Sequence, residues 1–165
     1  MPNFSMTHEI DCDVDRFWEL FFDEAFTKRM FADLEFKAYD FVSRKDTDTE
    51  IQMTIKAVPK MDMPGPIAKV LGDGFGYTEE GTFDRVKKVY RFVTKPNTLE
   101  GKLKSGGSIH CEPLGPNRCK RIVESYIEAK IFGIGGAIEK MTEKSYRDGF
   151  GKGADLMNRY IKEMK

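Results

Sequence analysis

One histidine occupies a position where it could do acid–base chemistry. His8 alternates with Met6 and Ile10 along the first apolar stretch, so its imidazole is predicted to face the interior of the fold. An imidazole in an apolar interior could hydrogen-bond a ligand or transfer a proton. A buried histidine whose hydrogen bonds are met by the protein alone is the more frequent outcome, and both interpretations stay open here.

Two carboxylates and one arginine are the other weak catalytic candidates. Asp40 and Glu79 each lie in an alternating stretch, on the face of the predicted strand whose other residues are mostly apolar. Burial would raise the pKa of such a carboxyl group and suit it to act as a general acid. Arg91 lies on the same face of its predicted strand as Val89 and Val93 and could pair with one of these carboxylates. An ion pair near the end of a strand would explain the same residues without any catalysis.

Motifs of the common catalytic and cofactor sites are missing. No Ser–His–Asp, P-loop or HExxH spacing occurs, and the GxG of residues 72–74 precedes a strand-like stretch, which argues against a dinucleotide site. The three cysteines, Cys12, Cys111 and Cys119, are odd in number and have no CxxC spacing. We therefore expect reduced thiols, no metal and no cofactor.

Composition limits the possible partners. The 165 residues contain 27 basic and 27 acidic side chains, so bulk charge does not favour nucleic acid. No apolar run reaches the length of a membrane span, and the first residues lack the basic and apolar segments of a secretory signal. We expect one domain, residues 1–165, in the cytoplasm.

Hydrophobic periodicity predicts strands followed by one long helix. Period-two alternation marks the first stretch and most of the middle, whereas dense apolar residues follow the first stretch. Asp13 is predicted to cap the helix after the first strand. The clearest predicted elements are a strand at 3–11, helices at 14–22 and 24–31, strands at 51–57 and 118–132, and a helix at 137–162.

The predicted C-terminal helix is apolar at both ends and small in its middle. Gly149, Gly151 and Gly153 each cost about 1 kcal/mol relative to alanine in a helix. Close approach of another backbone, room for a ligand beside the helix, or a kink would account for them. A weakened helix with a local break is the remaining interpretation, and all four stay open here.

Two segments resemble a known superfamily. Residues 10–23 (IDCDVDRFWELFFD) are similar to its strand, turn and aromatic helix, with Asp13 in place of the usual proline, and residues 127–139 (IEAKIFGIGGAIE) are similar to its last strand, glycine turn and helix start. The chain thus resembles the START-like (SRPBCC, helix-grip) superfamily, in an uncharacterised bacterial branch. The resemblance implies an α+β fold with a curved antiparallel sheet of about six or seven strands. Two short helices would follow the first strand, and a long C-terminal helix would cover the concave face.

The same resemblance implies a hydrophobic cavity but no catalytic residues. We expect binding or transport of a lipid, sterol or polyketide-like molecule between the sheet and the C-terminal helix. The expected lining residues are Met53, Ile55, Phe75, Tyr77, Ile109, Val123, Ile127, Met141 and Ser145. The insert between two strands would form a lid, with Met61, Met63, Ile67, Val70 and Leu71 as its apolar residues.

Two other functions fit the same sequence. A polyketide cyclase or aromatase would use polar groups in that cavity, with His8, Glu79, Tyr77 and Arg91 as the candidates. Alternatively, a filled interior would leave a domain that acts by contacting another protein. The expected partner is a hydrophobic small molecule, with transient membrane contact left open and the oligomeric state undetermined.

Overall fold

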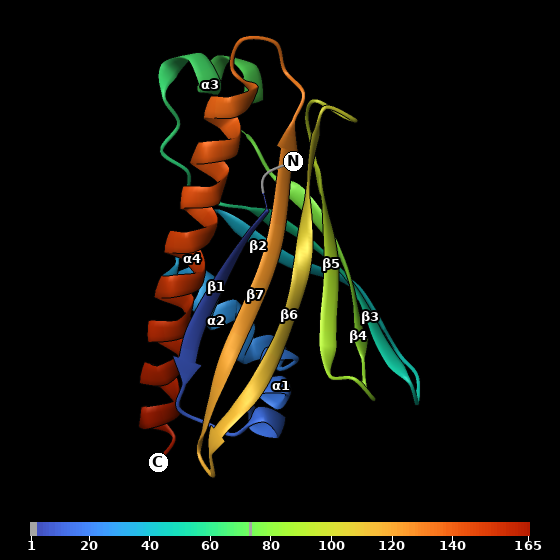
Figure 1. The fold of residues 1–165 in the computed structure, drawn as a ribbon, viewed down its shortest axis with the longest axis vertical. Coiled ribbons are helices and arrows are strands. Elements are labelled where there is room, and N and C mark those ends of the chain that lie inside the picture. Colours follow the sequence, from blue (N-terminus) through green and yellow to red (C-terminus); the bar gives the residue numbers. More distant parts are fainter. Residues whose placement is uncertain (1–2, 73) are drawn as a thin grey trace.

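The computed structural model describes residues 3–72 and 74–165, in which seven strands and four helices form (Figure 1). In chain order they are β1 (Asn3–Ile10), α1 (Val14–Phe21), α2 (Glu24–Asp33), β2 (Ala38–Asp46), β3 (Glu50–Val58), α3 (Gly65–Leu71), β4 (Tyr77–Asp84), β5 (Val89–Pro96), β6 (Leu103–Gly115), β7 (Arg118–Ala129) and α4 (Gly135–Glu163). The α+β order predicted from the sequence is confirmed, including the two short helices after the first strand.

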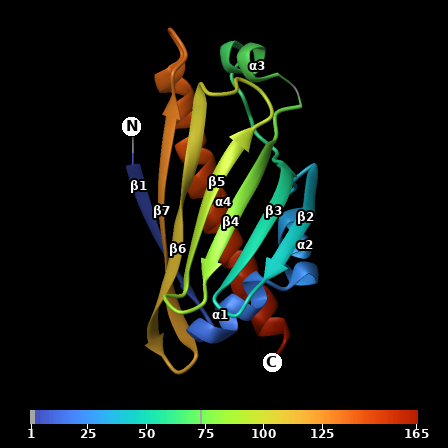
Figure 2. The ribbon, with the colours of Figure 1, turned by 90° about the vertical axis from the view of Figure 1, so that its right-hand side faces the viewer.

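The strands form one antiparallel sheet in the order β1-β7-β6-β5-β4-β3-β2 (Figure 2). Strands β2 to β7 follow one another as neighbours, and β1 pairs with β7 at the far edge. Helices α1 and α2 therefore carry the chain from one edge of the sheet to the other. All helices except α3 lie against one face, which we call the inner face, and α4 crosses it diagonally.

Aspartate caps start the two short helices. The Asp13 carboxylate accepts a hydrogen bond from the backbone N–H of Arg16 at 2.7 Å, and Asp23 accepts one from Phe26 at 2.8 Å. Each cap satisfies one of the free N–H groups at a helix start. The predicted Asp13 cap is confirmed, and it sets the direction in which α1 leaves β1.

The last strand ends earlier than its apolar pattern predicted. Residues 118–132 were expected to be extended, but β7 stops at Ala129. There the Glu139 carboxylate accepts the backbone N–H of Ala129 at 2.9 Å, and Gly133 turns the chain with φ 83°. A side chain from α4 thus ends the strand and fixes the start of the helix over it.

Two hydrophobic clusters make up the core. The larger lies between the inner face, α1, α2 and the C-terminal half of α4, with Phe17, Tyr90 and Tyr160 fully buried. The smaller lies beneath α3 at the opposite end of the sheet. Its buried members are Ile67, Leu71, Leu103, Ala129 and Ile138.

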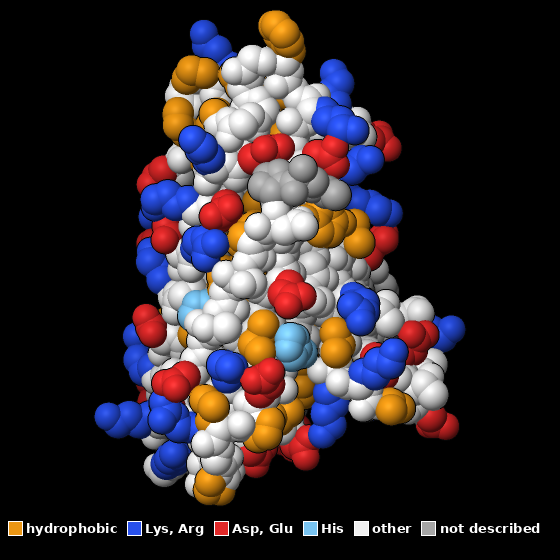
Figure 3. All heavy atoms as spheres, in the orientation of Figure 1, with side chains coloured by type: hydrophobic (Ala, Val, Ile, Leu, Met, Phe, Trp, Pro, Cys, Tyr) orange, Lys and Arg blue, Asp and Glu red, His pale blue; other side chains and the backbone are white. Residues whose placement is uncertain are grey.

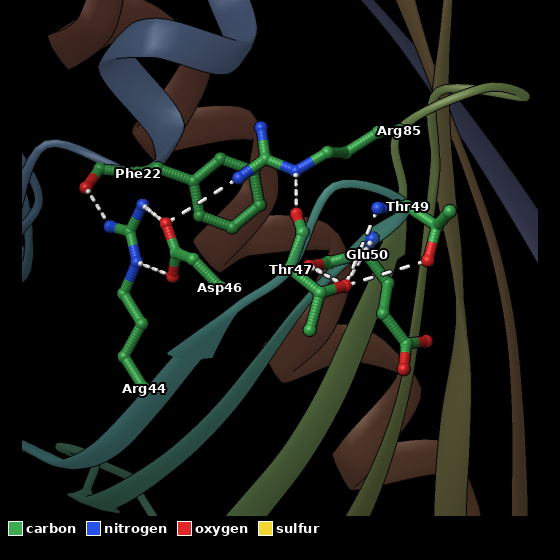
Figure 4. Close-up of polar contacts among 7 residues, drawn as sticks. All are labelled: Phe22, Arg44, Asp46, Thr47, Thr49, Glu50 and Arg85. Carbon is green, nitrogen blue, oxygen red and sulfur yellow. Dashed lines mark hydrogen bonds and ion pairs between the residues drawn. The ribbon is translucent and has the colours of Figure 1, made fainter.

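Charged contacts fasten the tip of the β2–β3 hairpin to its neighbours (Figure 4). Arg44 donates to the backbone carbonyl of Phe22 at 3.0 Å and forms two bonds, of 2.7 and 2.9 Å, to the Asp46 carboxylate. Arg85 donates to the carbonyl of Thr47 at 2.8 Å. These bonds join the hairpin to the α1–α2 corner and to the β4–β5 turn, and so close this end of the inner face.

The surface mixes both signs of charge, as the zero net charge implies (Figure 3). Apolar side chains gather at the end of the molecule formed by α3 and the β7–α4 loop. Phe132 in that loop is fully exposed. Across the residues that the structure describes, no helix has the length and hydrophobicity needed to cross a membrane.

Candidate functional site

Strand β4 brings polar side chains to the inner face. Its register pairs Glu79 with Ile55 on β3 and with Thr94 on β5, so Glu79 points to the same side as these residues. Tyr77, two residues earlier, points the same way because successive strand residues alternate between faces. The inner-face orientation predicted for Glu79 and Tyr77 agrees with this register.

Glu79 is a half-buried carboxyl group with one hydroxyl partner. Its Oε2 accepts a hydrogen bond from the Tyr90 hydroxyl at 2.8 Å. Burial raises the pKa of Glu79, and the hydrogen bond from Tyr90 opposes that rise only in part. The carboxyl group is therefore protonated over a wider pH range than an exposed glutamate, and in that form it can donate a hydrogen bond.

Gly81 makes the contact between Tyr90 and Glu79 possible. A Cβ atom added at Gly81 would lie 1.8 Å from the Tyr90 hydroxyl oxygen. The ring of Tyr90 crosses the backbone of β4 at this point, and no residue with a side chain leaves it room. A glycine in the middle of a strand weakens the strand, and here the close approach explains its presence.

Two further tyrosines border the site with free hydroxyls. Tyr39 on β2 and Tyr77 on β4 are half-buried, and among the described residues neither hydroxyl has a hydrogen-bond partner. Desolvation raises the pKa of both phenols, with the nearby Glu79 adding to the effect. The Tyr39 ring stacks on Phe31 of α2 at 3.8 Å between centroids. Tyr39 is thus held in place by Phe31, and the hydroxyls of both tyrosines are available to another molecule.

A chain of hydroxyl groups connects the sheet to α4. Thr94 on β5 hydrogen-bonds Ser105 on β6, and the Ser105 hydroxyl lies 3.2 Å from that of Tyr146 on α4. Burial raises the pKa of Tyr146 despite these bonds. The ring of Tyr146 also packs against Phe4 of β1, with 6.0 Å between centroids. Tyr146 therefore anchors the middle of the helix over one half of the sheet.

Small residues lie next to Tyr146 in the middle of α4. Ser145 and Gly149 are half-buried, and a Cβ atom added at Gly149 would have no heavy atom within 4 Å apart from its own helix. One turn later, a Cβ atom at Gly153 would lie 3.7 Å from the sulfur of Met30 on α2. The helix is thus in packed contact at Gly153 and borders unfilled space at Gly149.

The predicted lining residues fall into three groups. Tyr77 and Ser145 lie at the site just described. Five belong to the buried core of the inner face: Met53, Ile55, Ile109, Val123 and Ile127. Phe75 and Met141 pack against the smaller cluster beneath α3.

The predicted lid is a helix that packs on the smaller cluster. Ile67 and Leu71 of α3 are buried there, and Met63 packs against it. Met61 and Val70 are half-buried. The segment therefore covers the end of the interior next to the β7–α4 loop.

The three weak catalytic candidates do not converge. His8 does face inward from β1, but three strands separate β1 from β4, and its Nδ1 lies 3.1 Å from Nη2 of Arg121. Arg91 is exposed on the outer face, because its neighbours Tyr90 and Phe92 take the inner positions of β5. The prediction that Arg91 could pair with an interior carboxylate is wrong.

Asp40 also lies on the outer face. It pairs with Lys56 of β3 and is exposed, because Tyr39 and Phe41 take the inner positions of β2. Glu79 alone of the predicted catalytic group lies near Tyr39 and Tyr77 on the inner face.

Three tyrosines of the site were not predicted from the sequence: Tyr39, Tyr90 and Tyr146. A usable signal existed for Tyr90, because Gly81 lies in an otherwise well-formed strand and marks a close approach. Tyr39 and Tyr146 carried no such signal, since their roles depend on the crossing of α2 and α4 over the sheet.

Solved structures with the same fold include enzymes and a START protein. The Zhui aromatase/cyclase from Streptomyces sp. R1128 superposes with a TM-score of 0.71 at 10% identity, over 98% of this chain and 93% of that one. A START superfamily protein from Mycobacterium smegmatis gives 0.62 at 11% identity, over 99% of each chain. Norcoclaurine synthase from Thalictrum flavum gives 0.63 at 15% identity, over 99% of this chain and 88% of that one. At such identities the likeness establishes the fold.

A family model covers nearly the whole chain. It matches residues 5–161 and describes its members as proteins of unknown function, DUF2505. No curated protein matches the sequence. The chain therefore belongs to the DUF2505 family and has the START-like fold.

Proposed function

We propose that this protein binds a hydrophobic small molecule, of the lipid, sterol or polyketide-like class, between α4 and strands β2–β4. The proposal rests on the open space beside the half-buried Gly149 and on the free hydroxyl groups of the half-buried Tyr39 and Tyr77 on the inner face. Burial of apolar ligand surface would contribute about 25 cal/mol per Å² before ordering costs. Transport of the molecule between sites is the corresponding biological role.

The ligand would carry at least one polar group. The Tyr39 and Tyr77 hydroxyls and the Glu79 carboxyl group can each hydrogen-bond a hydroxyl or carbonyl oxygen. A few convergent polar groups in an apolar site fix the orientation of a bound molecule. A purely hydrocarbon ligand would leave these groups without partners, at a cost of about 1–3 kcal/mol for each one buried.

Entry would occur beside α3. This helix lies over the end of the interior, and the apolar surface of α3 and the β7–α4 loop surrounds it. Displacement of α3 would open a path along α4 toward Gly149. Transient contact of the exposed Phe132 with a membrane would suit delivery of a lipid.

Native mass spectrometry of the protein purified from its own source tests the proposal. We expect an adduct of defined mass that is lost on denaturation. Gly149→Leu should remove the adduct by filling the space, whereas Gly136→Leu, the same substitution at an exposed position of the same helix, should keep it. The proposed location would be contradicted if both variants kept the adduct, or if both lost it.

A cyclase or aromatase activity is the second candidate. It is favoured by the desolvated carboxyl group of Glu79, which could protonate a carbonyl oxygen of a bound molecule. His8 would take no part, because three strands separate its strand β1 from β4, which carries Glu79. Glu79→Gln separates the two functions: turnover lost with affinity kept favours the enzyme, and unchanged turnover excludes Glu79 as the acid.

A further inference from the structure

Arg121 places a buried positive charge apart from the polar groups around Glu79. It lies on the inner face of β7, beside β1 and beneath α4, which packs mainly on these two strands (Figure 1). The residue is 5% exposed. Burial lowers the pKa of Arg121 to about 10, so the guanidinium still carries its charge at neutral pH. The fold therefore holds a full positive charge in its interior.

The contacts of Arg121 are with neutral groups. Its Nη2 donates a hydrogen bond to the carbonyl oxygen of Phe150 at 2.9 Å and lies 3.1 Å from Nδ1 of His8. The guanidinium carbon lies 5.2 Å from the centroid of the Phe150 ring. Within the described ranges 3–72 and 74–165, no carboxylate forms an ion pair with Arg121, and its Nε has no hydrogen-bond partner. These contacts hold the guanidinium in position without neutralising it.

The cysteines near Arg121 do not balance its charge either. Cys111 on β6 pairs in register with Arg121, and Cys119 lies two residues earlier on β7. The pairing of β1 with β7 brings Cys12 to the same end of the sheet. All three are free, and in the part of the chain that the structure describes no sulfur atom accepts a hydrogen bond from Arg121. A buried thiolate without such a bond would be costly, so the guanidinium stays unbalanced.

His8 adds a directed N–H donor beside this charge. Arginine only donates hydrogen bonds, so the Nδ1 atom of His8 that faces Arg121 must be the acceptor. The imidazole is then neutral and carries its proton on Nε2. Burial and the charge of Arg121 lower the pKa of His8 and favour this neutral form, whereas the exposed Asp155 opposes them. The two side chains therefore offer one positive charge and one N–H donor side by side.

Glycines leave room next to this pair of side chains. Gly149 and Gly151 flank Phe150, whose carbonyl oxygen accepts the hydrogen bond from Arg121. A Cβ atom added at Gly149 would have no heavy atom within 4 Å apart from its own helix, and one at Gly151 would meet only Nε2 of His8, at 3.9 Å. The backbone of α4 is thus bare on both sides of the residue that positions the guanidinium.

We propose that Arg121 and His8 bind the acidic group, a carboxylate or a phosphate, of the molecule held beside α4. The ligand class is then an amphiphilic acid rather than a neutral lipid. This inference rests on the proposed function, which places the apolar part of that molecule along the middle of α4. An anion here balances the buried guanidinium, and its charge-assisted hydrogen bonds are roughly twice as strong as those between neutral groups.

A matched pair of ligands tests the charge preference. Dodecanoate and dodecanol have the same chain, and isothermal titration calorimetry measures the affinity of each. We expect the wild type to bind dodecanoate about tenfold or more tightly, since hydrogen bonds to charged groups contribute that much more than neutral ones. Arg121→Gln should lose this preference and keep its affinity for dodecanol. Arg91→Gln, which removes the same charge from the exposed outer face, should keep the preference.

Two further variants separate the charge from the hydrogen bonds. Arg121→Lys should keep part of the preference for dodecanoate, because it keeps the positive charge. His8→Phe should weaken the preference less than Arg121→Gln does, because it removes an N–H donor but no charge. A larger loss in His8→Phe than in Arg121→Gln would contradict the assignment of the charge to Arg121.

A measurement on the unmodified protein remains decisive if Arg121→Gln does not fold. With dodecanoate isotopically labelled at its carboxyl carbon, the NMR chemical shift reports whether the bound acid is ionised. We expect the bound carboxyl group to stay ionised to lower pH than in free dodecanoate, because a nearby positive charge favours the ionised form. Protonation of bound and free acid at the same pH would overturn the proposal.

Failure of this inference is distinct from failure of the proposed function. Equal affinities for dodecanoate and dodecanol, or a preference that survives in Arg121→Gln, would overturn the acidic ligand and leave binding of a hydrophobic molecule intact. Binding of neither compound would count against the proposed function itself. Displacement of dodecanoate by an equal concentration of acetate would show that the site takes free small anions, and would overturn the amphiphilic class.

Discussion

The inner face of the sheet contains a closed region beneath α1 and an open region beneath the middle of α4. In the closed region, Phe17 and Trp18 are 1% and 5% exposed, and the Trp18 ring lies 4.5 Å from that of Phe83. In the open region, Tyr39 and Tyr77 stay half-buried. The same sheet thus supports a filled core at one end and accessible polar groups farther along.

The difference arises from which residues each helix presents to the sheet. α1 presents large aromatic rings, which pack edge to face on one another and fill the interior. α4 presents Met157 and Tyr160, both buried, near its end, whereas in its middle the half-buried Ser145 and Gly149 lie next to Tyr146 and Phe150, which pack against the core. One side of the middle of α4 therefore presents less side-chain volume than α1 does.

The largest expected effect is on the closed region. Phe17→Ala should lower the free energy of unfolding by about 3–5 kcal/mol, because it leaves a cavity among buried rings. Phe41→Ala, the same change at a half-buried position of the open region, should cost less than half as much. Urea denaturation followed by circular dichroism measures both. Equal losses would show that the two regions are packed alike.

A smaller effect is expected where the regions meet at Gly81. Gly81→Ala forces Tyr90 away from β4, since the new methyl group would overlap its hydroxyl, and should cost about 1–3 kcal/mol of unfolding free energy. Gly136→Ala, at an exposed helix position with open space, should instead gain up to about 1 kcal/mol. If Gly81→Ala left the free energy of unfolding unchanged, the close approach of Tyr90 to β4, and with it the Tyr90–Glu79 hydrogen bond, would not contribute to stability.

The pH dependence of stability should report on Glu79. Because its pKa is raised in the folded state, the unfolded chain releases this proton first as pH rises above the usual glutamate value of 4.5. As pH rises from 4.5 to the pKa of Glu79 in the folded protein, Glu79 therefore lowers the free energy of unfolding more and more. Above that pKa its destabilising effect no longer changes with pH. Glu79→Gln should gain stability relative to the wild type across that window. A constant difference between the two proteins at every pH from 4 upward would contradict the desolvated carboxyl group.

Local patterns determined much of the fold but less of the site. Alternation correctly oriented His8, Tyr77 and Glu79, because a strand with one buried face fixes the direction of every side chain. It failed for Arg91, because β5 carries apolar residues on both faces: Val93 is 45% exposed, whereas Phe92 takes the inner position.

The proximity of the three cysteines was not predicted, for a different reason. Cys12 is about a hundred positions away from Cys111 and Cys119 in sequence, and only the pairing of β1 with β7 brings it to them. Cys111 and Cys119 could have been placed together by the register of the β6–β7 hairpin. Contacts between distant segments depend on sheet order, which periodicity alone does not specify.

The most direct test of the open region compares leucine at two positions one helical turn apart. Gly149→Leu should keep the free energy of unfolding or raise it by up to about 1 kcal/mol, because the side chain enters unfilled space and the helix gains propensity. Gly153→Leu should lower it by about 1–3 kcal/mol, because Met30 already occupies that position. Equal losses at both positions, measured by urea denaturation, would show that the interior is filled and contradict the account.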